Sequence, residues 1–200
     1  MVVKIKKQGE VKKFNLINSW ADVTMETWLK LIDFETGTKT EEATMTIAEL
    51  SDIPKELIKE LSLSDVAAIM QRIAELQENK DTRLKRIIEV NGVEYGFHPD
   101  LDSITLGEFA DIETIMKNGI DKNLPELMSI LYRPIKEKHI KGAYVIEAYD
   151  GNITMRVEEM KQMSASQVQA ALFFFFLLGK ELLKILQSYS MQKQKEMMTQ

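Results

Sequence analysis

The sequence predicts an α+β fold dominated by helices, on the basis of three observations. Extended runs flank two turn signals, Gln8-Gly9 and Asn91-Gly92, and each pair of runs predicts a β-hairpin. Apolar residues at helical spacing follow each hairpin and begin beside a capping residue. The pattern of the first part of the chain recurs later at a constant offset. We therefore expect two pseudo-repeated halves, each a β-hairpin followed by helices, with a long C-terminal helix.

Composition sets the first limits. The chain has 200 residues, 44% of them hydrophobic, which is enough for one sizeable core or two small ones. It contains no cysteine, which excludes thiol catalysis, disulfides and thiolate metal sites. No secretory signal opens the sequence, so we expect a cytoplasmic protein.

The first hairpin is rich in lysine. The lysines are Lys4, Lys6, Lys7, Lys12 and Lys13. They are typical of an exposed edge strand, where charge prevents pairing with other sheets. A contact with nucleic acid is the alternative, but the net charge of −5 and the lack of interleaved aromatic residues disfavour it.

The helix after each hairpin begins in the same way. Thr24 is placed to cap a helix whose apolar stripe includes Met25 and Trp28. Thr105 is placed to cap the later helix, with Glu108 completing a capping box. We expect Glu108, together with the acidic residues that follow it, to lie on a solvated face.

The two halves match at an offset of 81 residues. The matched pairs include Phe14 with Tyr95, Leu16 with Phe97, Thr24 with Thr105, Leu31 with Ile112 and Leu50 with Leu131. Further along the chain the offset is 102, matching Ile58 with Met160, Leu61 with Met163, Ser62 with Ser164, Ser64 with Ser166 and Val66 with Val168. A tandem duplication and the simple recurrence of hairpin, cap and helix both account for this pattern.

The change of offset predicts an insertion in the second half. Asp150-Gly151-Asn152 is a turn signal between two extended runs, Tyr144 to Ala148 and Ile153 to Val157. We therefore expect residues 1–80 to form the first half and residues 81–200 the second. The second half would carry an inserted hairpin at about 138–157, and both halves would pack as one compact unit.

Residues 171–178 read ALFFFFLL. A membrane-spanning helix needs about 20 apolar residues, and Gly179 and Lys180 end this run, so we expect no membrane span. A helix that is apolar on all sides must be covered. Phe173, Phe174, Phe175 and Phe176 are thus expected in a core formed by both halves, with an interface to another chain as the alternative.

The tail keeps a helical apolar period before it turns polar. It is the predicted partner-binding segment. Its candidate residues are Leu182, Leu183, Ile185, Leu186, Tyr189, Met191, Met197 and Met198.

Signals for chemistry are scarce. His98, Asp100, Asp102 and Glu108 could be drawn together as a metal site, but a turn leading into the Thr105 cap explains the same residues. No motif for phosphate binding and no nucleophile with a nearby base is found. We predict no catalytic residues, no metal and no cofactor, and hence a protein that is not an enzyme. The twelve methionines suit an adaptable surface for binding proteins.

Several segments between residues 86 and 183 resemble small proteins encoded in the virion-morphogenesis modules of tailed bacteriophages. The segments are VNGVEYGFHPDLDSITLGEFADIETIMKN, LPELMSILYRPIKE, YVIEAYDG and MSASQVQAALFFFFLLGKEL. The resemblance implies a non-enzymatic viral protein that assembles virions through protein–protein interactions. It would be like a tail assembly chaperone, or a component of the tail or connector.

The alternatives are a stoichiometric structural protein of the mature virion, in a ring or associated with the capsid, and a host-directed regulator that binds nucleic acid. The expected partners are other phage structural proteins, with a homo-oligomer also open. The expected location is the host cytoplasm during assembly, or the virion.

Overall fold

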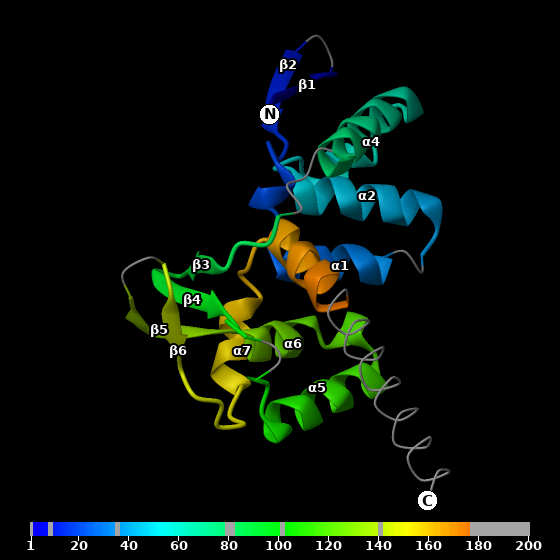
Figure 1. Ribbon diagram of the computed structural model, residues 1–200. Coiled ribbons are helices and arrows are strands. Elements are labelled where there is room, and N and C mark those ends of the chain that lie inside the picture. Colours follow the sequence, from blue (N-terminus) through cyan, green and yellow to red (C-terminus); the bar gives the residue numbers. More distant parts are fainter. Residues whose placement is uncertain are drawn as a thin grey trace, which may run out of the picture.

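The computed structural model describes residues 2–7, 10–34, 37–78, 83–100, 103–139 and 142–176. The fold is α+β, as predicted (Figure 1). In the described part of the chain, the strands form a two-stranded sheet near the N-terminus and a four-stranded sheet in the second half. A helix spans residues 165–176, and the rest of the segment predicted as a long C-terminal helix lies outside the described residues.

The first half is a hairpin followed by helices. Strands β1 and β2 pair antiparallel, and Thr38 caps α2 with a capping box to Glu41. The elements are β1 (Val2–Lys7), β2 (Glu10–Asn15), η1 (Trp20–Asp22), α1 (Met25–Phe34), α2 (Lys39–Leu50), α3 (Lys55–Ile58) and α4 (Leu63–Glu78).

The second half begins with the same order of elements and adds strands. Its sheet has the order β3-β4-β5-β6, and all neighbours are antiparallel. The elements are β3 (Ile87–Val90), β4 (Val93–Phe97), α5 (Leu106–Asn118), η3 (Ile120–Lys122), α6 (Leu124–Leu131), β5 (Tyr132–Lys138), β6 (Tyr144–Ile146), α7 (Thr154–Met160) and the helix 165–176.

The predicted turn between β3 and β4 is confirmed. Asn91 and Gly92 have φ of 50° and 78°, the left-handed values that a type I′ turn requires at both central positions. Val90 and Val93 pair across it.

Hydrogen bonds repeat at the predicted offset of 81. The Ile17 amide donates to the Leu50 carbonyl at 3.0 Å, and the His98 amide donates to the Leu131 carbonyl at 2.7 Å. The bridge between Leu16 and Ser51 likewise has its counterpart in the pairing of Phe97 with Tyr132. The two halves therefore share this backbone contact as well as apolar pattern.

The offset of 102 also holds. The hydroxyls of Ser62 and Ser64 lie 2.8 Å apart, as do those of Ser164 and Ser166. The amides of Val66 and Val168 each donate to the carbonyl of the serine four residues earlier, both at a distance of 3.0 Å. Helix α4 and the helix 165–176 thus begin with the same local structure.

The inserted hairpin is not built as predicted. Its first run does supply a strand, β6. This strand pairs antiparallel with β5, which precedes it in sequence, after a turn that includes Gly142 at φ 83°. The run predicted as the second strand, Ile153 to Val157, lies in and beside helix α7. The turn at Asp150 therefore leads into a helix, which buries Met160 in the second core.

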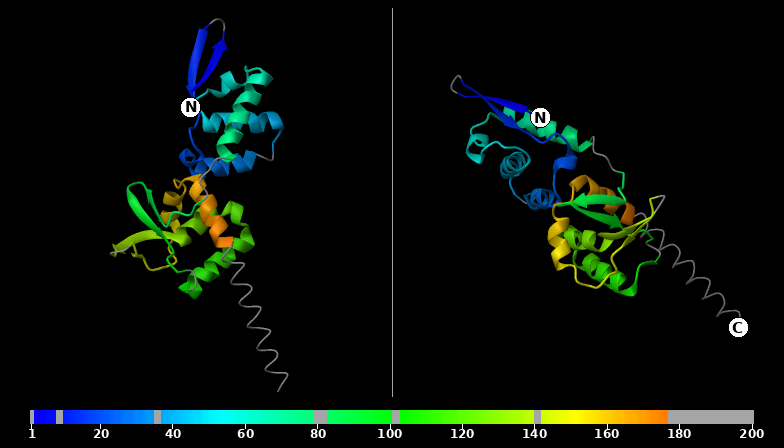
Figure 2. Two further views of the ribbon diagram at one scale, coloured as in Figure 1. Left: turned by 45° about the horizontal axis from the view of Figure 1, so that its top comes forward. Right: turned by 90° about the vertical axis from the view of Figure 1, so that its left-hand side faces the viewer.

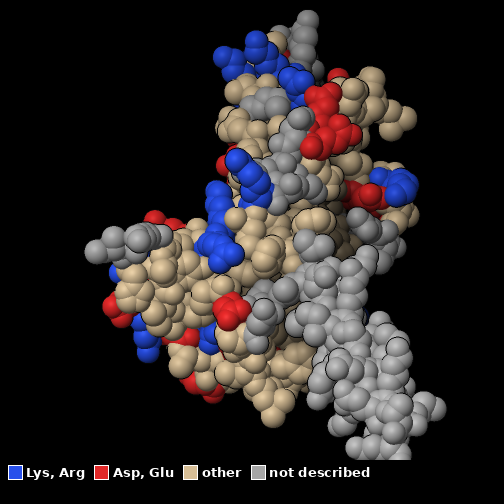
Figure 3. All heavy atoms as spheres, in the orientation of Figure 1, with Lys and Arg blue, Asp and Glu red and all other residues tan. Residues whose placement is uncertain are grey.

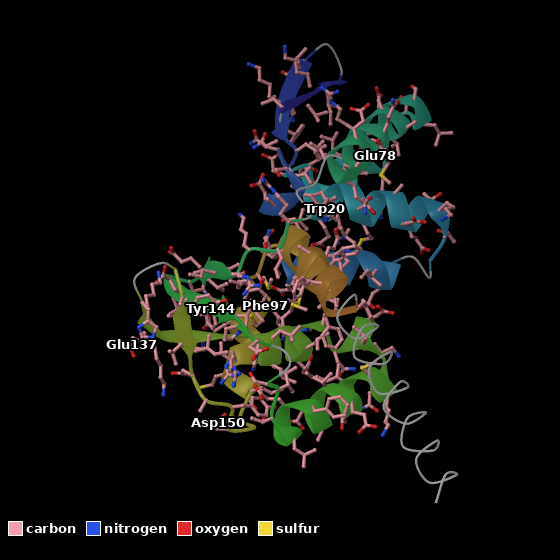
Figure 4. The ribbon with its side chains drawn as sticks, in the orientation of Figure 1. Trp20, Glu78, Phe97, Glu137, Tyr144 and Asp150 are labelled. Carbon is pink, nitrogen blue, oxygen red and sulfur yellow. The ribbon has the colours of Figure 1, made fainter. Side chains whose placement is uncertain are left out.

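Two cores occupy the two halves. Trp20 and Ile47 belong to the first core, and Phe97 and Tyr132 to the second. In Figure 4, Phe97 and Tyr144 lie together in the second half and Trp20 lies in the first. Among the described helices, none is both long and apolar enough to cross a bilayer.

Helix α1 and the helix 165–176 join the halves. Both views in Figure 2 show the orange helix 165–176 where the two halves meet. Ala165 belongs to the first core although it comes from the second half, and Met25 belongs to the second core although it comes from the first. Trp28 on α1 packs against both cores.

Candidate protein-binding surface

The phenylalanine run divides between core and surface. Phe174 and Phe175 pack against the second core, and the Phe174 ring lies edge-on to Phe97 with centroids 5.6 Å apart. Phe173 and Phe176 point outward and are 70% and 50% exposed. Residues three apart share one face of a helix, so these two rings form a single surface feature, which we call the outward phenylalanine pair.

The expectation that all four phenylalanines are covered by the two halves is thus met for only two of them. The seam covers the helix where Val168 and Ala171 face the second core. At 100° per residue, the four consecutive phenylalanines spread around the helix, so a seam on one side leaves Phe173 and Phe176 uncovered. Two adjacent exposed aromatic rings are typical of a protein interface.

The other predicted partner residues cannot be placed on a surface. Leu182, Leu183, Ile185, Leu186, Tyr189, Met191, Met197 and Met198 lie outside the described residues. The first of them, Leu182, comes six positions after Phe176 in sequence. Their role in partner binding therefore stays a prediction.

A buried ionic cluster lies between helix α5 and strand β5. Arg133 on β5 contacts Glu108 with Nη2 2.6 Å from Oε1, and His98 Nε2 lies 3.5 Å from the same oxygen. The other carboxylate oxygen accepts from the Thr105 amide at 2.7 Å and from its hydroxyl at 2.6 Å. Glu108 thus completes the predicted capping box and fastens α5 to the sheet.

Protonation in this cluster follows from burial and charge. Burial acts to raise the pKa of Glu108, but the Thr105 hydrogen bonds and the nearby Arg133 outweigh it and hold that pKa below its usual value. Burial lowers the pKa of His98, against the opposing effect of Glu108. The cluster is therefore an anionic carboxylate beside a cationic guanidinium, with a histidine that resists protonation.

The prediction that Glu108 lies on a solvated face is wrong. Asp111 is only partly exposed and accepts a hydrogen bond from the Tyr149 hydroxyl, whose pKa is raised by burial and by this bond. The signal that sequence reasoning missed is Arg133. An arginine that follows the apolar run LMSILY at a strand start needs a buried carboxylate, and Glu108 supplies it.

Each ionisable group of the cluster contacts another protein side chain: Arg133 and His98 both contact Glu108. Within the described residues, no group of three or more histidines or carboxylates is placed to hold a metal ion. Asp102, from the metal alternative, lies outside the described residues. The arrangement can position α5 and β5, and Glu108 shares its two oxygens between the cap and the ion pair.

Two hollows lie beside the starts of α4 and the helix 165–176. One, of about 380 Å³, is lined by Ile5, Leu61 and Ser62 among others. The other, of about 240 Å³, is lined by Ile88, Met163 and Ser164 among others. Leu61 and Ser62 match Met163 and Ser164 at the offset of 102, so the two hollows share matched lining positions.

The N-terminal lysines lie on the two-stranded hairpin. Lys4 pairs directly with Lys13, and Lys12 is also exposed. Figure 3 shows basic side chains at this end of the molecule, next to acidic ones on neighbouring elements. The mixture suits an exposed hairpin that avoids pairing with other sheets.

Comparison with known proteins adds no relative: no protein-family model, curated protein or solved structure matches this chain.

Proposed function

We propose that this protein is a non-enzymatic component of phage virion assembly that acts by binding other structural proteins. The single observation that carries the proposal is the outward phenylalanine pair. The exposed rings of Phe173 and Phe176 lie on the helix that joins the two halves, and its other side packs into the second core, so a partner bound there would contact a helix held by the fold.

The phage context comes from the resemblance between residues 86 and 183. Of the roles that it implies, we propose a tail assembly chaperone-like factor or a tail or connector component. Both would cover the outward phenylalanine pair with apolar surface of a tail or connector protein. The tail that follows in sequence would extend the same contact.

Two measurements test the proposal. An affinity-tagged protein isolated from infected cells is expected to bring a tail or connector protein with it, and a Phe173→Asp/Phe176→Asp variant is expected to lose that partner. Met155→Asp changes another exposed apolar residue, 86% exposed on α7, and should retain the partner. Equal recovery with all three proteins would refute the assigned surface.

Mass spectrometry of purified virions then separates the alternatives. A chaperone-like factor is expected in infected cells and absent from mature particles. A stoichiometric structural component is expected in particles at a fixed ratio to the tail or connector protein. Salt-sensitive retention on nucleic acid, lost when Lys4, Lys12 and Lys13 are changed to Gln, would instead favour the host-directed regulator.

A further inference from the structure

The junction between the halves is built from two helix starts. The Met25 amide donates to the Met163 carbonyl at 2.7 Å, and the Ala165 amide donates to the Val23 carbonyl at 2.8 Å. Met25 and Ala165 are both 0% exposed. Each half therefore places the first residue of one helix in the core of the other.

Each side of this junction has a second copy elsewhere in the chain. The segment 23–25 matches 104–106 at the offset of 81, and 163–165 matches 61–63 at the offset of 102. Thr24 and Thr105 cap their helices alike, with amides of Thr27 and Glu108 donating to the threonine hydroxyls at 3.2 and 3.3 Å. The starts of α4 and the helix 165–176 share the serine contacts given above.

The second copies have no partner in the described part of the chain. Leu106, the counterpart of Met25, is 84% exposed, and Leu63, the counterpart of Ala165, is 88% exposed. Phe109 is exposed too, whereas its counterpart Trp28 packs against both cores. Single exposed leucines need no explanation, but here they occupy the two positions that the internal junction buries.

The two free sides lie far apart. Figure 1 shows α4 and α5 at opposite ends of the molecule, with the internal junction between them. The two free sides of one molecule therefore cannot pair with each other. A second molecule of the same chain offers the complementary side.

We propose that the chain self-associates head to tail by repeating its internal junction between molecules. The segment Ile104-Thr105-Leu106 of one copy would pair with Leu61-Ser62-Leu63 of the next. The Leu106 amide would donate to the Leu61 carbonyl, and the Leu63 amide would donate to the Ile104 carbonyl. Leu106 would enter beside the 380 Å³ hollow that Leu61 and Ser62 line.

The side chains around the free sides are compatible with this pairing. In the internal junction Glu26 faces Gln162, whose amide nitrogen lies 3.4 Å from the Glu26 carboxylate. The matched positions are Gly107 and Glu60. Glu60 would thus meet a glycine with open space around it, and two carboxylates would not be brought together.

The contact uses two different patches, so it is heterologous and can form a ring or an open chain of copies. Such self-association would hold whether or not the protein serves in phage assembly. It uses the helix starts at Leu63 and Leu106 and not the outward phenylalanine pair, so each surface can be changed by its own substitutions.

Sedimentation velocity over a wide concentration range tests the proposal. The full-length protein is expected to form species larger than a dimer as concentration rises. Leu63→Glu alone and Leu106→Glu alone should each remain monomeric, because every contact between two molecules would then bury one glutamate. The association constant should fall at least about tenfold. Circular dichroism checks that both variants fold, and Met155→Glu is the matched control that should associate normally.

Mixing the two variants is the decisive step. A Leu63→Glu copy keeps an intact Leu106 side, and a Leu106→Glu copy keeps an intact Leu63 side. The mixture should therefore form a one-to-one dimer and nothing larger. Wild-type protein that stays monomeric, single variants that associate like wild type, or a mixture that stays monomeric would each overturn the proposal.

Discussion

Replacing Phe174 by aspartate should unfold much of the protein, whereas the same change at Phe173 should not. The two residues are adjacent, but the Phe174 ring packs against Phe97 and the second core, while Phe173 is 70% exposed. Loss of a core phenylalanine costs about 3–5 kcal/mol, and partial burial places Phe174 near the lower end of that range. A carboxylate at the same site adds a desolvation penalty of roughly 1–3 kcal/mol.

The sum, about 4 kcal/mol or more, is a large part of a typical domain stability of about 5–15 kcal/mol. Urea unfolding followed by circular dichroism should show a midpoint lowered by roughly 1.5 M or more, or no folded baseline. Phe173→Asp should change the free energy of unfolding by no more than about 0.5 kcal/mol. Equal midpoints for the two variants would refute the division of the phenylalanines between core and surface.

The remaining predictions concern the second half. Gly96→Ala should destabilise the second half by about 1–3 kcal/mol, because the new methyl group would lie 2.7 Å from Cδ2 of Tyr144. The hydroxyl of Tyr144 donates to the Phe97 carbonyl, so the ring cannot move away without losing this bond. A thermal melt checks this prediction, and an unchanged melting temperature would contradict it. Glu108→Gln should cost about 3–5 kcal/mol at neutral pH, because Arg133 would remain buried without its counter-charge; a urea midpoint equal to wild type would argue against the ion pair. Because the folded pKa of Glu108 is lowered, its contribution to stability is present above about pH 4.5 and is lost as pH falls through the folded pKa, so this acid slope should shrink in Glu108→Gln. The folded pKa of His98 is also lowered, so stability should decline as pH falls below about 6.5, where the unfolded chain takes up the proton; the same slope in His98→Gln would show that another group is responsible.

The parts of the fold that the sequence predicted are those set by local signals. Asn91-Gly92 specified a turn because both residues tolerate positive φ, and Thr105 with Glu108 specified a helix start because the two side chains satisfy free amides. The constant offsets carried the same logic from one half to the other, and the matched hydrogen bonds follow it.

The parts that it could not predict depend on contacts between distant residues. Local turn residues at Asp150 fit a hairpin and a helix start equally well, and packing of Met160 into the second core decides for α7. Glu108 looked solvated until Arg133, which follows it by 25 positions, was placed beside it. The outward face of the phenylalanine run likewise depends on which side of the helix 165–176 the seam covers.

The most direct test of the proposed function, which takes the protein to be encoded by a phage, is virion yield from such a phage carrying Phe173→Asp/Phe176→Asp in this gene. The encoded protein should accumulate in folded form, since both side chains are exposed, and yet few infectious particles should form. A phage carrying Met155→Asp serves as the matched control and should give normal yield. A normal yield of particles from the phenylalanine variant would contradict the assignment of this surface to virion assembly.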